Sequence, residues 1–337
     1  MKKSALYIAA VVLVLSLFAS CSPSAGRSSL YRVSGDGVLS WVNYDLIGED
    51  VEIPESVNGR KITAIGYEAF CGFPKLRSVT LPDCVTKLEP RAFACCRNLE
   101  SVKLPDSVTQ IGTNAFLECE SLKTINVPSA LKTIGQGAFA ECRLLSSFDL
   151  PDGLESLGTG AFYGCSELGS VKIPSALTEI SSGAFSYCSD LTTVTIPSNV
   201  KTIGSTAFKN CVDLNTVIIE NGVEKIDYSA FYGCEELTVV TIAPSVKTIG
   251  DNAFSYCKKL VSIAIPEGVK DIGEDTFWCC SELASISIPS TVTSIGNGAF
   301  RYCDKLTSVT IENTDGALGD PSVWGVDTSK TTVTYTK

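Results

Sequence analysis

The chain has 337 residues, long enough for two ordinary domains, with a formal net charge of −10 at pH 7 and no histidine. The acidic balance disfavours nucleic acid as a partner, because phosphate backbones repel such a surface. Without histidine the chain lacks the commonest general base and the commonest metal ligand, so we expect no enzyme, no cofactor and no metal.

The first residues have the composition of an export signal. A short basic start precedes an apolar run over residues 5–18, which is shorter than the roughly 20 residues that a membrane-spanning helix needs. We therefore predict a signal peptide over residues 1–20. Residues 17–21, Leu-Phe-Ala-Ser-Cys, resemble a bacterial lipobox of the looser spirochaetal kind, with Phe where Leu is usual. This resemblance implies lipid attachment to Cys21 and a polar tether in residues 21–29. The alternative is ordinary cleavage followed by secretion.

A repeat of 23 residues fills the body of the chain, marked by phenylalanine from Phe70 to Phe300. An alanine precedes each phenylalanine, except at Thr276. Counting from this phenylalanine, position +3 is Cys in every copy but the first, where Phe73 stands, and +6 is Leu. Position +9 is Val or Ile, apart from Phe148, +11 is aliphatic and +12 is usually Pro. Aliphatic residues follow at +15 and +18, and usually Gly at +19.

Each part of the repeat predicts a local structure. Positions +6 to +11 end in an alternation at period two, rich in β-branched residues, which indicates a short strand with one buried face. A second, shorter extended stretch lies around +15 to +18, and Gly204 and its equivalents at +19 are expected to supply the positive φ of a corner. The segment Ala-Phe-x-x-Cys is expected to form one helical turn, 3₁₀-like. We therefore predict a strand-dominated leucine-rich-repeat solenoid of about eleven parallel coils, roughly 50 Å long at about 4.8 Å per coil.

The unit Ile-Gly-x-x-Ala-Phe-x-x-Cys-x-x-Leu-x-x-Val-x-Ile-Pro resembles the repeat of BspA-like, or treponemal-type, leucine-rich-repeat proteins. The resemblance covers residues 61–311. Residues 30–60 are similar to that family's N-terminal cap, and we assign residues 312–337 to a cap at the other end, because a solenoid must cover its last apolar face.

The resemblance implies an adhesin that binds proteins: host matrix proteins such as fibronectin and fibrinogen, host cells, or other bacteria. We expect a monomeric lipoprotein held by its lipid to the outer membrane and exposed at the cell surface. The alternative is a structural or scaffolding lipoprotein facing the periplasm. The family pattern contains no catalytic residue.

The cysteines at position +3 form a column through the stack. Disulfides are frequent outside the cytoplasm, but side chains of one column point the same way, so we interpret the column as a spine of buried, unpaired thiols. A zinc site at Cys71, Cys95 and Cys96 is the remote alternative, because CxxC spacing is absent. The column consists of Cys96, Cys119, Cys142, Cys165, Cys188, Cys211, Cys234, Cys257, Cys280 and Cys303.

Two other groups of residues each allow a structural and a functional interpretation. An acidic cluster is either a solvated edge, which we favour, or a calcium site; it consists of Asp251, Asp271, Glu274 and Asp275. An aromatic stripe is either corner packing, which we favour, or a platform for sugars; it consists of Tyr163, Tyr187, Tyr232, Tyr256, Trp278 and Tyr302.

The outward positions of the predicted strand offer the most informative surface. Position +8 is Ser or Thr in ten of eleven copies, which predicts a strip of hydroxyl groups along one face. Val239 interrupts this strip, and further apolar residues appear beside it at Ile218, Val261 and Ala264. An exposed apolar patch is typical of a contact site, so we predict a protein-binding site at these four residues. The alternative is simple strand propensity at positions that tolerate any side chain.

Overall fold

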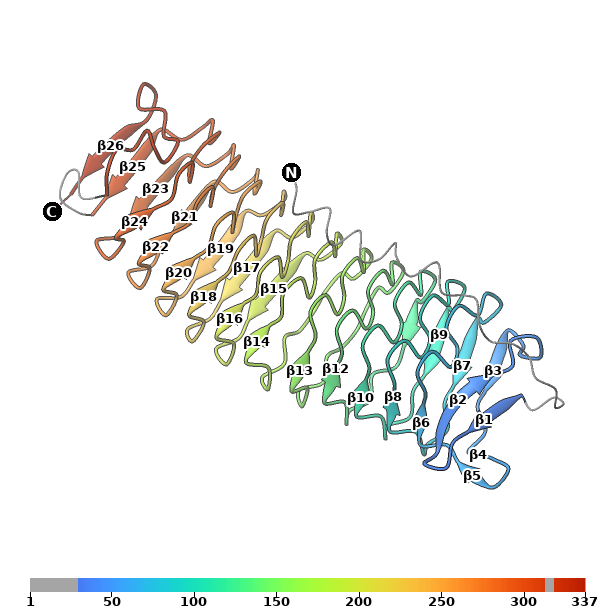
Figure 1. Cartoon of the computed structure of the whole chain (residues 1–337). Helices are drawn as coiled ribbons and strands as arrows, with labels where there is room; N and C mark the ends of the chain where they lie inside the picture. Colours follow the sequence, from blue (N-terminus) through green and yellow to red (C-terminus); the bar gives the residue numbers. More distant parts are fainter. Residues whose placement is uncertain (1–29, 313–317, 337) are drawn as a thin grey trace.

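Each 23-residue repeat forms one coil, and the coils stack side by side into an elongated solenoid (Figure 1). The computed structural model describes residues 30–312 and 318–336, and in these residues it contains strands and turns but no helix. Side chains from every coil fill one continuous apolar core along the stack. The predicted leucine-rich-repeat solenoid is therefore confirmed.

Positions +8 to +11 form short parallel strands, which together make one face of the stack in three successive sheets; we call it the strand face. Its inward side chains at +9 and +11 are buried and those at +8 and +10 point outward, as the period-two pattern predicts. Its strands are β3 (Asp50–Glu52), β7 (Ser78–Thr80), β9 (Ser101–Lys103), β11 (Thr124–Ile125), β15 (Thr193–Ile196), β17 (Thr216–Ile219), β19 (Val239–Ile242), β21 (Ser262–Ala264), β23 (Ser285–Ile288), β25 (Ser308–Ile311) and β26 (Thr332–Tyr335).

The second extended stretch forms its own ladder of very short strands. After β2 (Val38–Val42), it comprises β6 (Ala64–Ile65), β8 (Lys87–Leu88), β10 (Gln110–Ile111), β12 (Thr133–Ile134), β13 (Ser156–Leu157), β14 (Glu179–Ile180), β16 (Thr202–Ile203), β18 (Lys225–Ile226), β20 (Thr248–Ile249), β22 (Asp271–Ile272) and β24 (Ser294–Ile295). Both ladders are parallel, and within the repeats they pair residues 23 positions apart, for example Ile203 with Ile226.

The phenylalanine corner differs from the predicted helical turn. In the coil of Phe93, three overlapping turns close through bonds from Ala92 N to Glu89 O (3.2 Å), Ala94 N to Arg91 O (3.1 Å) and Cys96 N to Phe93 O (3.3 Å). The amides between them donate to the next coil, as Phe93 N does to Ala115 O at 2.8 Å. The corner is therefore a third ladder between coils.

Positive φ angles on both sides of the phenylalanine explain why no helix forms, since a helical turn needs consecutive residues with negative φ. In every coil the residues at positions −2 and +2 have positive φ. The residues at −2 are Glu68, Arg91, Asn114, Gly137, Gly160, Gly183, Thr206, Ser229, Asn252, Asp275 and Gly298. Those at +2 are Gly72, Cys95, Glu118, Glu141, Gly164, Tyr187, Asn210, Gly233, Tyr256, Cys279 and Tyr302.

The glycine at +19 serves close packing and not a left-handed corner, contrary to the prediction. Gly204 has no positive φ, but a Cβ added there would lie 2.6 Å from Ile180 O and 2.8 Å from Ser182 N of the preceding coil. The absent side chain therefore lets adjacent coils approach.

The phenylalanine rings stack along the core. Consecutive rings have centroids 4.9–5.8 Å apart and planes within 17° of parallel. Beside them runs the cysteine column, in which each Sγ donates a hydrogen bond to the phenylalanine carbonyl of the preceding coil at 2.9–3.4 Å.

The first coil has no phenylalanine carbonyl before it, and its position +3 is Phe73 in place of cysteine. The Phe73 ring packs on the rings of Phe70 and Tyr44, with centroids 5.5 and 5.9 Å away.

Both ladders are interrupted near the middle of the stack. The strand face has no strand between β11 and β15, where Phe148 replaces the usual Val or Ile and its ring lies 4.8 Å from that of Phe139. We attribute the interruption to the bulk of this ring. The second ladder breaks between β13 and β14, where the Ser181 hydroxyl donates to Leu157 O at 2.6 Å.

The two ends depart from the repeat. At the first end, β1 (Tyr31–Val33) pairs antiparallel with β2, and β4 (Ser56–Val57) pairs antiparallel with β5 (Arg60–Lys61). At the other end, Phe300 N donates to Trp324 O at 2.7 Å, and the Trp324 side chain is only 2% exposed. Buried side chains from these end segments, among them Tyr31, Leu39 and Trp324, extend the apolar core beyond the repeats.

The packing role of glycine at +19 can be tested by comparing two alanine substitutions. Gly204→Ala should lower the free energy of unfolding by about 1–3 kcal/mol, because backbone atoms must move to admit Cβ. Gly169→Ala is the control: no atom lies within 4 Å of the added Cβ, and φ is not positive. It should leave stability unchanged or raise it slightly. Urea unfolding monitored by circular dichroism measures both, and equal midpoints would contradict the assignment.

The thiol column can be tested by alkylation. Burial raises the pKa of the ladder thiols, as for Cys188 and Cys257, so they stay protonated and unreactive at neutral pH while the chain is folded. We expect the ten ladder cysteines to resist alkylation in the native protein and to react fully in denaturant without a reductant. Intact mass spectrometry measures the number of alkylated cysteines. Ladder cysteines that remain blocked in denaturant would show that the column is paired.

Candidate functional site

The strand face presents two outward rows of side chains. Position +8 carries the row of Ser and Thr, and position +10 carries a more varied row. Because both rows stand on a hydrogen-bonded ladder, neighbouring members lie about 4.8 Å apart. The face therefore displays a regular surface whose chemistry changes only with the outward residues.

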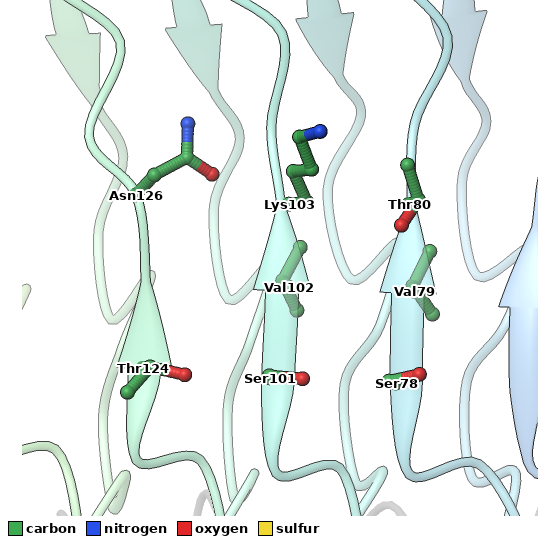
Figure 2. A pocket seen from close by; sticks show the side chains of 8 residues that line it. All are labelled: Ser78, Val79, Thr80, Ser101, Val102, Lys103, Thr124 and Asn126. Carbon is green, nitrogen blue, oxygen red and sulfur yellow. The ribbon is translucent and has the colours of Figure 1, made fainter.

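A shallow depression of about 520 Å³ lies over β7, β9 and β11 (Figure 2). Ser78, Ser101 and Thr124 form one row across the three strands, and a second row runs parallel to it. The second row consists of Thr80, Lys103 and Asn126, and the apolar side chains between the rows are Val79 and Val102.

Some polar groups at the depression already have partners. The Ser78 hydroxyl donates to Asp50 Oδ1 at 2.6 Å. Asn126 accepts from Leu104 N and donates to Leu104 O, both at 2.7 Å, so its amide closes the end of the ladder. Within residues 30–312 and 318–336, Lys103 has no carboxylate at ion-pair distance, which leaves its ammonium available to a ligand.

An ion pair flanks the depression. Arg77 donates from Nε and Nη2 to Glu100 Oε1, at 3.1 and 2.6 Å, and thereby lowers the pKa of that carboxyl. Beside it, a smaller hollow of about 250 Å³ is lined in part by Arg77, Glu100 and Asn98. We did not predict this part of the face as a site. The residues at positions +8 and +10 that line the depression are visible in the sequence. Hydroxyl groups and a lysine are common on exposed strands, however, so they did not indicate a site.

The predicted apolar residues also lie on the strand face. Ile218 on β17, Val239 on β19 and Val261 just before β21 are 40%, 49% and 52% exposed, and Ala264 on β21 is exposed as well. Ile218 pairs with Thr241, and Val239 pairs with Thr216, so these two apolar side chains are diagonal neighbours. β21 begins another sheet, so Val261 and Ala264 lie on the next coil across a break in the ladder.

Two of the acidic residues considered for metal binding already accept hydrogen bonds. Asp251 Oδ1 accepts from Glu274 N at 2.8 Å, and Asp271 Oδ1 accepts from the Ser294 hydroxyl at 2.7 Å. In the described part of the chain no three His, Cys, Asp or Glu residues are placed to hold a metal ion. This applies both to the acidic cluster and to Cys71 with Cys95.

The aromatic stripe forms two groups of rings in mutual contact. Tyr163 and Tyr187 have centroids 5.2 Å apart. Four rings form a continuous second group, with successive centroid distances of 5.3, 4.7 and 5.9 Å: Tyr232, Tyr256, Trp278 and Tyr302. The contacts within the second group are edge-to-face, while Tyr302 is 59% exposed, so corner packing and a platform for sugars both stay predictions.

Cys21, with the predicted signal peptide and tether, lies outside the described residues. In the ranges that the structure describes, no helix is long and apolar enough to cross a membrane. In the described part of the chain, the strand face offers hydroxyl groups, the Lys103 ammonium and an apolar patch, which suit non-covalent binding.

Comparison with known proteins places these features in a family. The BspA type leucine rich repeat region matches residues 48–147, 109–238 and 201–322. A leucine rich cell surface protein from Faecalibacterium prausnitzii is similar, with 26% identity, a TM-score of 0.55 and coverage of 92% of this chain and 99% of that one.

A second solved structure, the pneumococcal vaccine antigen PcpA, is 21% identical, with a TM-score of 0.58 over 91% of this chain and 90% of that one, and supports the fold alone. No curated protein matches the sequence. Leucine-rich-repeat solenoids are generally non-catalytic scaffolds that bind proteins, and BspA-like members are typically exported or displayed at the cell surface. Because the matched segments together span residues 48–322, the chain belongs to the BspA-type leucine-rich-repeat proteins.

Proposed function

We propose that this chain is a cell-surface lipoprotein that acts as an adhesin, with its strand face as the protein-binding surface. The observation that carries the proposal is the exposure of two large apolar side chains, Ile218 and Val239, on adjacent strands of that face, with Val261 exposed just before β21 on the next coil. Water-exposed aliphatic groups cost free energy that a protein partner recovers by covering them.

The surroundings of this patch suit a protein partner. Hydroxyl groups at Thr216, Thr238 and Thr241 adjoin it; the first two donate to Asn215 and can accept hydrogen bonds from a partner. In protein interfaces a few buried anchors usually provide most of the affinity, and the polar rim around them excludes water. Ile218 and Val239 would be the anchors, and the threonine hydroxyls the rim.

The proposed partners are proteins outside the cell: host matrix proteins such as fibronectin or fibrinogen, or surface proteins of other bacteria. Lipid on Cys21 would hold the solenoid at the outer membrane. The export-like N-terminal sequence and the likeness to a cell surface protein support this placement. A scaffold facing the periplasm would present the same face to a different partner.

The binding face can be tested with the double variant Ile218→Asp/Val239→Asp. Both side chains point outward, so folding should be preserved, while binding to a protein partner should weaken at least tenfold, or about 1.4 kcal/mol. Binding to immobilised fibronectin, fibrinogen and whole bacteria is the measurement, with circular dichroism to verify the fold.

Val212→Asp is the matched control, because Val212 is also exposed, at 36%, but lies outside the outward rows of the strand face. It should leave binding unchanged. If the double variant binds as tightly as the parent, the site is elsewhere. If no tested protein binds the parent chain, the proposed partners are wrong.

The anchor can be tested with Cys21→Ser. This variant lacks the proposed site of lipid attachment, so the protein should move from the membrane fraction to the soluble fraction. Proteolysis of intact cells gives the second measurement: digestion of the parent protein supports surface exposure, whereas full protection supports the periplasmic scaffold. Membrane association that survives the substitution would refute attachment through Cys21.

A further inference from the structure

Cys71 and Cys95 differ from the cysteines of the ladder. Each ladder thiol donates to a phenylalanine carbonyl, whereas Cys71 and Cys95 lie half-buried at the corner, at positions +1 and +2 of the first and second coils. Gly72 N donates to Ala94 O at 2.7 Å, which holds residues 71–72 beside residues 94–95. The backbone ladder therefore places two thiols from different coils side by side.

The side chains complete a compact arrangement. Arg91 Nη2 donates to Cys71 Sγ at 3.8 Å, and the Cys95 thiol lies close enough to Cys71 for the two groups to affect each other's ionisation. Glu68 Oε1 lies 2.6 Å from Arg91 Nε, without hydrogen-bond alignment, and keeps the guanidinium in place by charge attraction. A cation thus faces one sulfur, and a second sulfur lies within reach of it.

This arrangement favours ionisation of one thiol only. The neighbouring Cys95 thiol, together with Arg91, lowers the pKa of Cys71 to about 7, against the opposing effects of burial and Glu68. The pKa of Cys95 is raised by the neighbouring Cys71, by burial and by Glu118. At neutral pH a substantial fraction of Cys71 is therefore thiolate, while Cys95 keeps its proton.

We propose that Cys71 and Cys95 form a thiol–disulfide exchange site that accepts a low-molecular-weight disulfide, R–S–S–R. The Cys71 thiolate attacks one sulfur of this disulfide, its S–S bond breaks, and the leaving thiolate takes a proton to become RSH. Cys95 then gives its proton to water, and its sulfur attacks the Cys71 sulfur of the mixed disulfide. The second RS⁻ leaves and is protonated. Two protein thiols are oxidised to one disulfide, and one R–S–S–R is reduced to two RSH.

The same chain contains a natural comparison. Cys279 occupies the +2 position with a φ of 58°, close to the 60° of Cys95, but the +1 residue of the preceding coil is Ser255. Asp275 stands where the coil of Cys95 has Arg91, and burial and Asp304 raise the pKa of Cys279. Cys279 therefore shares the corner geometry of Cys95, but it has neither a thiol at the position of Cys71 nor a cation at the position of Arg91.

The test uses the full-length chain with Cys21→Ser, which removes the proposed lipid site. The protein is incubated at pH 7 with oxidised glutathione, quenched by alkylation and mapped by peptide mass spectrometry. We expect a disulfide between the peptides of Cys71 and Cys95, with Cys279 left free to be alkylated. With Cys95→Ser the glutathione adduct on Cys71 should persist, and with Cys71→Ser neither step should occur.

Arg91→Gln provides a variant that keeps both thiols. It should slow adduct formation on Cys71 at pH 7, by up to about tenfold as the pKa moves towards the ordinary value near 8.5. Circular dichroism verifies that each variant folds. Equal reaction rates at Cys71 and Cys279, or a Cys71 adduct that persists while Cys95 is present, would overturn the proposal.

Discussion

The whole structure depends on satisfying the backbone between coils. A coil of 23 residues has too little interior to pair its own amides, so they pair with a neighbour about 4.8 Å away. Two ladders do this with extended strands. The third ladder lies at the phenylalanine corner. There, the residues of positive φ let successive amides donate in turn to a carbonyl of the same coil and to one of the next coil. The stacked rings and the cysteine column follow from the same spacing, since each must repeat at the distance the backbone sets.

The sequence was sufficient to predict the coil, its strand and its buried columns, because burial selects the same residue type in every copy. The corner could not be predicted in the same way. Its left-handed positions are occupied by residues as different as Glu118, Tyr187 and Gly233, since only the backbone is repeated there. The prediction for the glycine at +19 was wrong although the residue itself is repeated. A repeated glycine indicates either positive φ or close approach of two backbones, and the sequence alone does not distinguish these causes.

The candidate sites divide along a similar line. The apolar patch could be found from the sequence because large apolar residues at outward positions of a strand are exceptions to a regular pattern. The depression over β7, β9 and β11 could not, because its hydroxyl groups are the pattern itself. The neighbouring thiols of Cys71 and Cys95 required knowledge of how positions +1 and +2 of adjacent coils align. Both proposed sites therefore lie where individual residues depart from the repeated pattern while the backbone stays the same.

The bond from each ladder cysteine to the phenylalanine carbonyl one coil earlier gives the stack a direction. If a whole number of repeats were inserted within the array, the first new cysteine would donate to the phenylalanine carbonyl of the coil before it. The last new phenylalanine carbonyl would accept from the cysteine of the coil after it, so no group would lack its partner. Tandem duplication or deletion of one 23-residue unit should therefore be among the least disruptive changes open to this gene, far milder than an insertion of other length. Only the ends are not interchangeable, since Phe73 and Trp324 close them differently. The length of the solenoid is thus a trait that evolution can adjust in steps of one coil.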